Sequence, residues 1–176
     1  CSSDLPTRAV ITKISYFKSC LYQMITTQYH YGGIIPYYCD EQGVYYLLLG
    51  RESYDQTWAP FGGHTETGEN ITTASTREAY EETMGILGNW DQIQTMISQA
   101  KYGIVYCNTR GSRPGGSWSF QFLIPIDRED ALALPNYFNN VYQYLTHCSN
   151  VARASEGCYE KTELAWFPLT EVMEAV

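Results

Sequence analysis

Residues 58–86 read Trp58-Ala-Pro-Phe-Gly-Gly-His-Thr-Glu-Thr-Gly-Glu-Asn-Ile-Thr-Thr-Ala-Ser-Thr-Arg-Glu-Ala-Tyr-Glu-Glu-Thr-Met-Gly-Ile86, and the rest of the chain is organised around this stretch. Its first part is a loop with Gly63 and Gly68, and its second part has the character of a helix. Asn70 is a good N-cap, because its side-chain oxygen can accept a hydrogen bond from the first helical turn. Gly85 can end the helix, since glycine readily adopts a left-handed conformation.

The predicted helix carries three glutamates at i, i+3 and i+4, namely Glu78, Glu81 and Glu82. On a wheel of about 100° per residue they all lie within about 80° of the apolar Ile71. Carboxylates on one partly inward face repel one another, and burial strengthens this repulsion. The pattern therefore predicts a cationic partner, and the hard ions Mg²⁺ and Mn²⁺ prefer such oxygen ligands. The alternative is a solvated acidic face with Arg77 as a local partner.

The spacing of this stretch resembles the Nudix box. That family pattern is Gly, five residues, Glu, seven residues, Arg-Glu, a bulky aliphatic, any residue, Glu-Glu, any residue, Gly and a bulky aliphatic. The matching positions are Gly63, Glu69, Arg77, Glu78, Glu81 and Glu82. Agreement at six specified positions is very improbable by chance. Two positions depart from the pattern, because Ala79 replaces the aliphatic residue and Met84 replaces the later glycine.

The resemblance implies an α/β fold, a Nudix-like α/β/α sandwich with a mixed β-sheet. It covers residues 30–176 as the Nudix domain, and residues 1–29 are then an N-terminal extension packed on the core. Apolar residues recur from Ala9 to Thr27 without one clean period, which fits a strand followed by a helix.

The remaining chain reads as strands and helices around the box. Strands at 31–39 and 44–50 form a hairpin through the turn at 40–43. Their near-continuous apolar runs predict burial on both faces. Further strands are expected at 58–61, 102–107, 118–126 and 162–169, with helices at 89–102, from Pro135 to Cys148 and from Thr170. Pro135 suits the first turn of a helix, because its missing N–H has no partner there anyway.

The resemblance also implies an enzyme, a metal-dependent pyrophosphohydrolase acting on a nucleoside diphosphate linked to another group. Glu78, Glu81 and Glu82 are then the ligands of Mg²⁺, for which Mn²⁺ can substitute, and the backbone carbonyl of Gly62 is a further ligand. Arg77 and Glu69 form an ion pair that orients the helix and the loop. The general base is one of these glutamates or a glutamate of a later loop. The sequence leaves Glu160 and Glu163 open for that role, with Glu163 also a candidate substrate contact, and an exposed pair before a strand is an equally good interpretation of both.

Substrate contacts are expected from basic residues outside the box. Arg51 follows a strand, and Arg110 and Arg113 lie in a long loop between two strands. Long loops next to sites are often functional, although a solvated arginine and a ligand-free surface loop are equally good interpretations. A nucleotide-type small molecule is the expected substrate. A nucleotide-binding module without catalysis is the alternative, but such a module is expected to lose box carboxylates, and here all are present.

Composition and charge limit the number of domains, the kind of partner and the location of the protein. The 176 residues suffice for one domain with a substantial core. A net charge of −8 argues against binding to long nucleic acids, which requires a basic surface. No apolar run predicts a membrane span or a signal peptide. Six cysteines without a Cys-x-x-Cys pair favour a reduced, cytoplasmic protein, with lipid-anchored, secreted and homodimeric forms left open.

Overall fold

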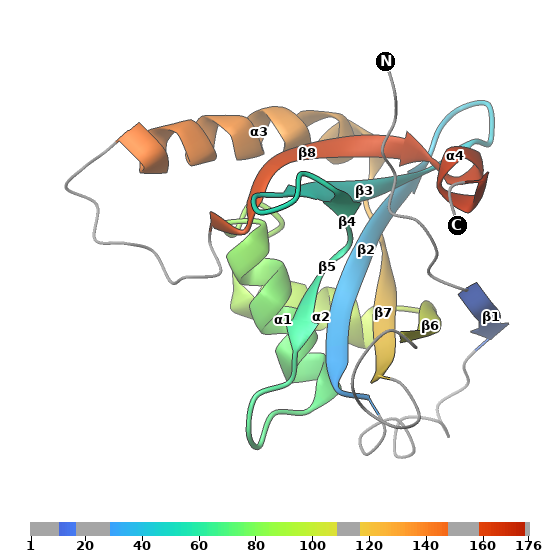
Figure 1. The fold of residues 1–176 in the computed structure, drawn as a ribbon. Coiled ribbons are helices and arrows are strands. Elements are labelled where there is room, and N and C mark those ends of the chain that lie inside the picture. The colour runs from blue at the N-terminus through green and yellow to red at the C-terminus, as the bar shows by residue number, and fades with distance from the viewer. Residues whose placement is uncertain (1–10, 17–28, 109–116, 148–158, 175–176) are drawn as a thin grey trace.

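The computed structural model describes residues 11–16, 29–108, 117–147 and 159–174, which form a β-sheet and several helices (Figure 1). The strands are β1 Ile11–Tyr16, β2 Tyr31–Cys39, β3 Tyr45–Glu52, β4 Trp58–Ala59, β5 Phe61–His64, β6 Tyr102–Asn108, β7 Ser117–Pro125 and β8 Lys161–Pro168. The helices are α1 Ile71–Glu82, α2 Trp90–Gln99, α3 Arg128–His147 and α4 Leu169–Glu174. The predicted order of elements after residue 30 is confirmed.

The described strands form one mixed sheet in the order β1-β6-β7-β2-β3-β4, with β5 also paired to β2 and β8 to β3. The pair β2–β7 is parallel, whereas the other pairs are antiparallel. Helices α1 and α2 lie together beside β2, β5 and β7, and α3 runs along β8 (Figure 1). This arrangement confirms the predicted α/β fold with a mixed sheet.

The hairpin β2–β3 closes as the sequence predicts. The side chain of Asp40 accepts hydrogen bonds from the backbone N–H groups of Gln42 and Val44, at 2.9 and 2.8 Å. Gly43 has a φ of +82°, a conformation that favours glycine. Residues 32–36 of β2 are all buried, so the continuous apolar run does mark a strand covered on both faces.

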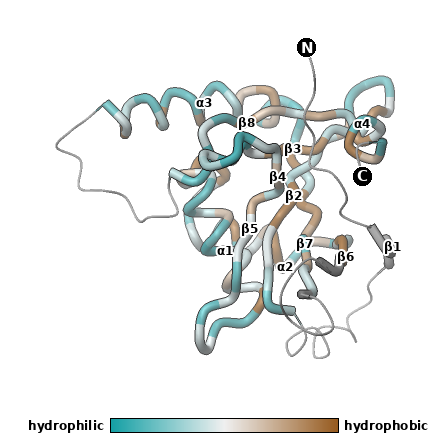
Figure 2. The backbone as a smooth tube through the Cα atoms, in the orientation of Figure 1, coloured by the Kyte–Doolittle hydropathy of each residue, from teal (hydrophilic) through white to brown (hydrophobic). Residues whose placement is uncertain are grey.

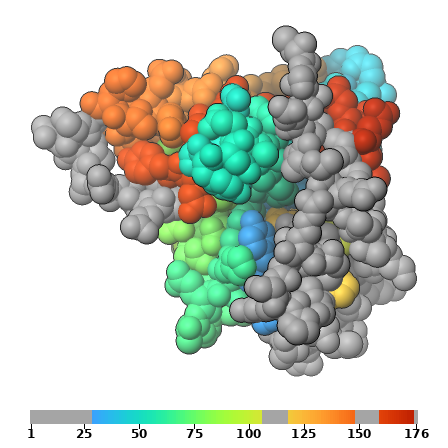
Figure 3. Space-filling view, in the orientation of Figure 1, coloured from blue at the N-terminus to red at the C-terminus, as the bar shows by residue number. Residues whose placement is uncertain are grey.

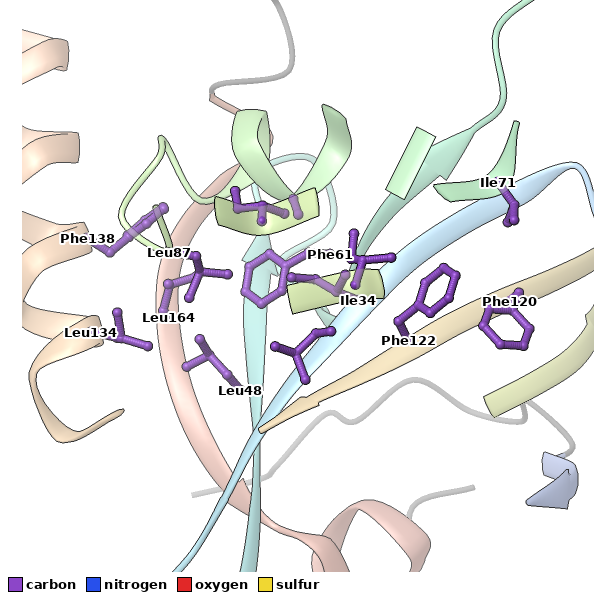
Figure 4. Close-up of a cluster of buried hydrophobic side chains, with 14 residues drawn as sticks. Ile34, Leu48, Phe61, Ile71, Leu87, Phe120, Phe122, Leu134, Phe138 and Leu164 are labelled. Carbon is purple, nitrogen blue, oxygen red and sulfur yellow. The ribbon is translucent and has the colours of Figure 1, made fainter. Parts of the chain in front are cut away.

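One hydrophobic cluster joins the sheet to the helices (Figure 4). In the middle of this cluster Phe61 lies beside Ile34, and at one end Phe138 of α3 points toward Leu87. Hydrophobic stretches lie within β2, β3 and β7, whereas hydrophilic residues follow one another in the loop before α1 and in the outer turns of α3 (Figure 2). Among the helices that the structure describes, none is long and apolar enough to cross a membrane.

The N-terminal segment contributes a strand to the sheet. β1 pairs antiparallel with β6 from Ile11 opposite Tyr106 to Tyr16 opposite Tyr102. The strand expected in this segment is therefore present. The helix expected after it, up to Thr27, lies outside the described residues.

Helix α3 differs from the prediction, because it begins at Arg128 and holds Pro135 in its interior. A proline inside a helix cannot donate to the carbonyl four residues earlier, here that of Ala131. The indole Nε1–H of Trp166 on β8 donates to this carbonyl instead, at 2.8 Å. A contact from a distant strand thus satisfies the group that Pro135 leaves unpaired, and the helix continues through the proline.

Candidate functional site

Helix α1 forms as the cap and the apolar face predict. The side chain of Asn70 accepts a hydrogen bond from the backbone N–H of Thr73 at 2.9 Å and so caps the helix. Its buried face consists of Ile71, Ala74, Ser75, Thr76, Glu78, Ala79 and Glu82. Two of the box glutamates are therefore on the inward face, in line with Ile71, and Glu81 is partly buried beside them. The inward position of these carboxylates is what the wheel indicated.

The C-cap residue Thr83 is followed by two consecutive left-handed residues. Gly85 has a φ of +72°, as expected for the residue that ends the helix, and its N–H donates to the carbonyl of Tyr80 at 2.9 Å. Met84 also has a positive φ, +52°. This is the position at which the box pattern has a glycine, so the departure from the pattern places a methionine in a conformation that costs about 1–2 kcal/mol.

Arg77 connects the loop to the helix. Its guanidinium donates to both carboxylate oxygens of Glu69, from Nε at 3.0 Å and from Nη2 at 3.1 Å. Nη2 also donates to the backbone carbonyl of His64 at 3.0 Å. Burial tends to raise the pKa of Glu69, but the hydrogen bonds from Arg77 and from the N–H of Glu66 bring it below its usual value. A planar fork of this kind fixes the loop 64–69 against α1.

The same guanidinium reaches two box glutamates. Nη1 of Arg77 lies 2.8 Å from Oε1 of Glu78 and 3.4 Å from Oε2 of Glu81. The carboxylate of Glu78 packs directly on Gly63, where an added Cβ would overlap it. Burial raises the pKa of Glu78, although Arg77 opposes this shift. The glycine of the box therefore makes room for the first glutamate of the helix.

Glu82 is only 1% exposed, and both its oxygens have protein partners. The backbone N–H of Gly62 donates to Oε2 at 2.7 Å, and the ammonium of Lys161 lies 3.3 Å from Oε1. Lys161 is itself 1% exposed and forms a second ion pair with Glu52. The three charged side chains come from the ends of α1 and β3 and the start of β8. On the surface, the teal region around the end of β3 adjoins the red region of β8 (Figure 3).

Burial dominates the electrostatics of this triad. It raises the pKa of Glu82 to about 8 and also raises that of Glu52. Burial alone would lower the pKa of Lys161, but the two carboxylates raise it above its usual value. Lys161 thus stays charged, as a buried cation shared by two acids.

Lys161 and Glu52 are site residues that no sequence motif predicts. A lysine at the start of a strand and a glutamate at the end of one usually lie in solvent. Their burial depends on each other and on Glu82, which is distant in sequence. Gly50 is the sequence feature that indicates this burial, because a Cβ at that position would lie 2.8 Å from Cδ of Lys161. The absence of a side chain there leaves room for the lysine stem.

Gly62 lies between the site and the first strand of the hairpin. Its N–H contacts Glu82, and its carbonyl accepts a hydrogen bond from the hydroxyl of Tyr31. The ring of Tyr31 packs edge-on against His64, with centroids 5.5 Å apart. The carbonyl that the resemblance offers as a metal ligand therefore has a protein donor already.

Of the remaining residues predicted for the site, the structure describes Arg51, Glu160 and Glu163. Arg51 lies within β3 and pairs with Glu163 of β8 at 3.4 Å, with both side chains about half exposed. Glu160 is exposed, and its negative charge contributes to the raised pKa of Glu78 on α1. Arg110 and Arg113 lie outside the described residues.

The donor chemistry suits a hard divalent cation. The groups on the inner face of α1 and on the adjoining strand are carboxylate and carbonyl oxygens, which Mg²⁺ and Mn²⁺ prefer. Within residues 29–108, 117–147 and 159–174, however, no three acidic, histidine or cysteine side chains converge as one metal-holding group. Arg77 and Lys161 occupy the carboxylates in this conformation. A bound cation would have to share these oxygens with the two protein cations or displace them.

Comparison with known proteins identifies a family. The family model described as a NUDIX domain matches residues 31–175. No curated protein matches the sequence significantly.

Solved structures also match, at low similarity. A C. elegans Ap4A hydrolase in a binary complex is 16% identical over 82% of this chain and 83% of that chain, with a TM-score of 0.48. The M. smegmatis Nudix hydrolase RenU is 14% identical over 83% of this chain and 74% of that chain, with a TM-score of 0.43. A Francisella tularensis bifunctional NMN adenylyltransferase/ADP ribose pyrophosphatase, complexed with AMP and a Mn ion, is 17% identical over 85% of this chain and 36% of that chain, with a TM-score of 0.46.

Proposed function

The chain belongs to the Nudix hydrolase family, and from that premise we propose that it cleaves the pyrophosphate of a nucleoside diphosphate linked to another group. The observation that carries the proposal is the inner face of α1. It places Glu78 and Glu82 against the glycine backbone at 62–63, with Glu81 partly buried beside them. A helix whose buried face ends in carboxylates is costly to fold unless a cation compensates the charge.

We assign the role of metal ligands to Glu78, Glu81 and Glu82, with the carbonyl of Gly62 as a further ligand. Their oxygens suit Mg²⁺, with Mn²⁺ as a substitute. When bound, such an ion neutralises charge on the pyrophosphate and lowers the pKa of a water molecule. Carboxylate oxygens have two lone pairs each, so an oxygen that accepts one protein hydrogen bond can still take an ion.

The residues around the ligands hold them in place. Arg77 and Glu69 keep the loop closed on α1 through their two parallel hydrogen bonds. Between the two late glutamates, we favour Glu160 as the general base. Glu160 is exposed, and its charge raises the pKa of Glu78. The carboxylate of Glu163, in contrast, is paired with Arg51. A base must be free to accept a proton from a water molecule near the scissile phosphate.

The substrate is a nucleotide-type small molecule in this proposal. The net charge of −8 leaves few basic side chains to meet an anionic substrate. Arg51, partly exposed at the end of β3, is the basic contact that we propose within the described residues, with Arg110 and Arg113 as further contacts. These residues lie outside the box, in the part of the chain that sets the substrate selectivity of family members.

The test is turnover of a panel of nucleoside-diphosphate-linked compounds. Wild type, Glu82→Gln and Glu66→Gln would be compared with Mg²⁺, with Mn²⁺ and with chelator. Glu66 is the matched control, because it belongs to the same stretch but its side chain is 71% exposed and its ion pair with Nε of Arg77 is long, at 3.9 Å. We expect metal-dependent turnover of at least one compound by wild type and Glu66→Gln, and loss of turnover in Glu82→Gln.

A nucleotide-binding module without turnover is the second candidate. The occupation of the carboxylates by Arg77 and Lys161 favours it, since a helix neutralised in this way does not require a metal ion. Binding of a panel compound without release of any product, in wild type and Glu82→Gln alike, would identify the module and reject the hydrolase.

A further inference from the structure

Lys161 is a buried cation that the proposed mechanism does not use. It is the first residue of β8, it is 1% exposed, and its ammonium pairs with Glu52 and with Glu82. A lysine is rarely buried this completely unless it is paired. Its position beside the last glutamate of the box connects it to the chemistry proposed for that helix.

The fold makes room for this lysine. Gly50 of β3 lies under its stem, and a Cβ at Gly50 would come within 2.8 Å of Cδ and 2.9 Å of Cγ. Lys161 is paired with Glu52 across β8 and β3, so a stem that lies over Gly50 runs along the sheet, and its ammonium meets Glu82 at the end of α1. The ammonium is therefore held in one place by packing of the stem as well as by its charges.

The contacts of Glu82 are divided evenly between its two oxygens. Oε1 faces the ammonium of Lys161 at 3.3 Å, and Oε2 accepts the N–H of Gly62 at 2.7 Å. One protein donor on each oxygen fixes the plane of the carboxylate and leaves a lone pair on each oxygen. Partners of this kind orient metal-binding carboxylates in many sites.

We propose that Lys161 is a positioning residue for the metal site, whose ammonium, anchored by Glu52, holds the Glu82 carboxylate in the orientation that takes a divalent ion. The inference rests on the proposed function, which makes Glu82 a metal ligand. Lys161 itself touches neither the ion nor the substrate. It also offsets the repulsion between two carboxylates that share one buried space.

A purely structural role makes a different prediction. In that case the triad only ties α1, β3 and β8 together, and metal affinity follows stability. Removing Lys161 alone leaves two buried carboxylates without their cation, which strongly destabilises a protein. Replacing Lys161 and Glu52 together by neutral residues of similar size removes one charge of each sign and is expected to restore much of the stability.

Binding of Mn²⁺, followed by electron paramagnetic resonance, separates the two roles without any substrate. The proteins are wild type, Lys161→Met, the double variant Lys161→Met/Glu52→Gln, and Lys101→Met as a control. Lys101 is exposed, so its substitution changes the net charge as Lys161→Met does, away from the triad. Thermal unfolding of each protein in chelator shows which variants are folded.

We expect the double variant to be folded and to bind Mn²⁺ at least about 10-fold more weakly than wild type, the usual effect of losing such a partner. Lys101→Met should bind as wild type does. A double variant that binds Mn²⁺ as tightly as wild type, or more tightly, overturns the positioning role while leaving the proposed function intact. A wild-type protein that binds no Mn²⁺ overturns both.

Discussion

Gly63 lies directly against the carboxylate of Glu78, so that the glutamate fills the space of the missing side chain. An added Cβ at Gly63 would overlap Oε1, Cδ and Oε2 of that glutamate. The backbone of β5 and the inner face of α1 therefore approach as closely as a glycine allows. This contact gives a physical reason for the glycine and the glutamate in one motif.

The contact predicts that Gly63→Ala displaces Glu78 and lowers activity on the panel substrate by about 100-fold, as small misplacements of catalytic groups do. Gly68→Ala is the control in the same loop. Its Cβ would meet nothing within 4 Å, although its φ of +86° costs about 1 kcal/mol for alanine. The control should lose stability and keep its activity. Equal activity of the two variants would show that the contact does not position Glu78.

Local patterns were sufficient to predict α1 and the β2–β3 hairpin. The helical period placed Glu78 and Glu82 in line with Ile71, and Asn70 marked the start of the helix. In the hairpin, the Asp40–Gly43 turn lies between two apolar runs. Each of these signals comes from residues that are neighbours in sequence, and sequence patterns record such relationships directly.

Long-range contacts explain what the sequence did not predict. Pro135 indicated a helix start, but the helix continues through it, because Trp166, a residue of β8, donates to the carbonyl of Ala131. The triad was missed for the same reason, since the burial of Lys161 depends on Glu52 and Glu82, far away in the chain. No local pattern records which distant residue satisfies a buried group.

Trp166 and Pro135 should be energetically coupled. Trp166→Phe removes the donor to Ala131 and should cost about 1–3 kcal/mol, because it leaves a buried carbonyl unpaired. In a Pro135→Ala background the N–H of residue 135 can donate to the same carbonyl, so the same substitution should cost less. A double-mutant cycle by chemical denaturation measures the difference, which we expect to be about 1 kcal/mol. Additive effects would mean that the indole hydrogen bond contributes nothing to the helix.

At position 84 a glycine variant should be more stable than an alanine variant, which reverses the usual order of these two residues. Both Met84→Ala and Met84→Gly remove the half-buried side chain, so their loss of packing is nearly the same. The φ of +52° penalises alanine but not glycine. We expect the glycine variant to be more stable than the alanine variant by about 1 kcal/mol in urea unfolding. A more stable alanine variant would mean that the end of α1 relaxes to an ordinary conformation.

Arg77 should not be replaceable by lysine. Arg77→Lys keeps the charge but loses the two parallel hydrogen bonds to Glu69, and hydrogen bonds to charged groups each contribute about 1.5–3 kcal/mol. We expect a loss of about 2 kcal/mol in stability together with lower activity. Arg128→Lys is the control, because its pair with Glu41 is exposed and should matter by less than about 0.5 kcal/mol. Comparable losses in the two variants would argue against a special role of the fork.

The buried acid Glu82 should make the metal-free protein less stable as the pH rises. Burial raises its pKa from 4.5 to about 8 in the folded chain, so between these values the folded protein holds a proton that the unfolded chain has released. Stability therefore falls with pH across this range and is lowest above about pH 8. Glu82→Gln, a neutral mimic of the protonated acid, should match wild type near pH 5 in chelator and exceed it near pH 9. Unfolding by urea at both pH values measures this difference. A constant difference between the two proteins would show that Glu82 is already ionised in the folded state at pH 5.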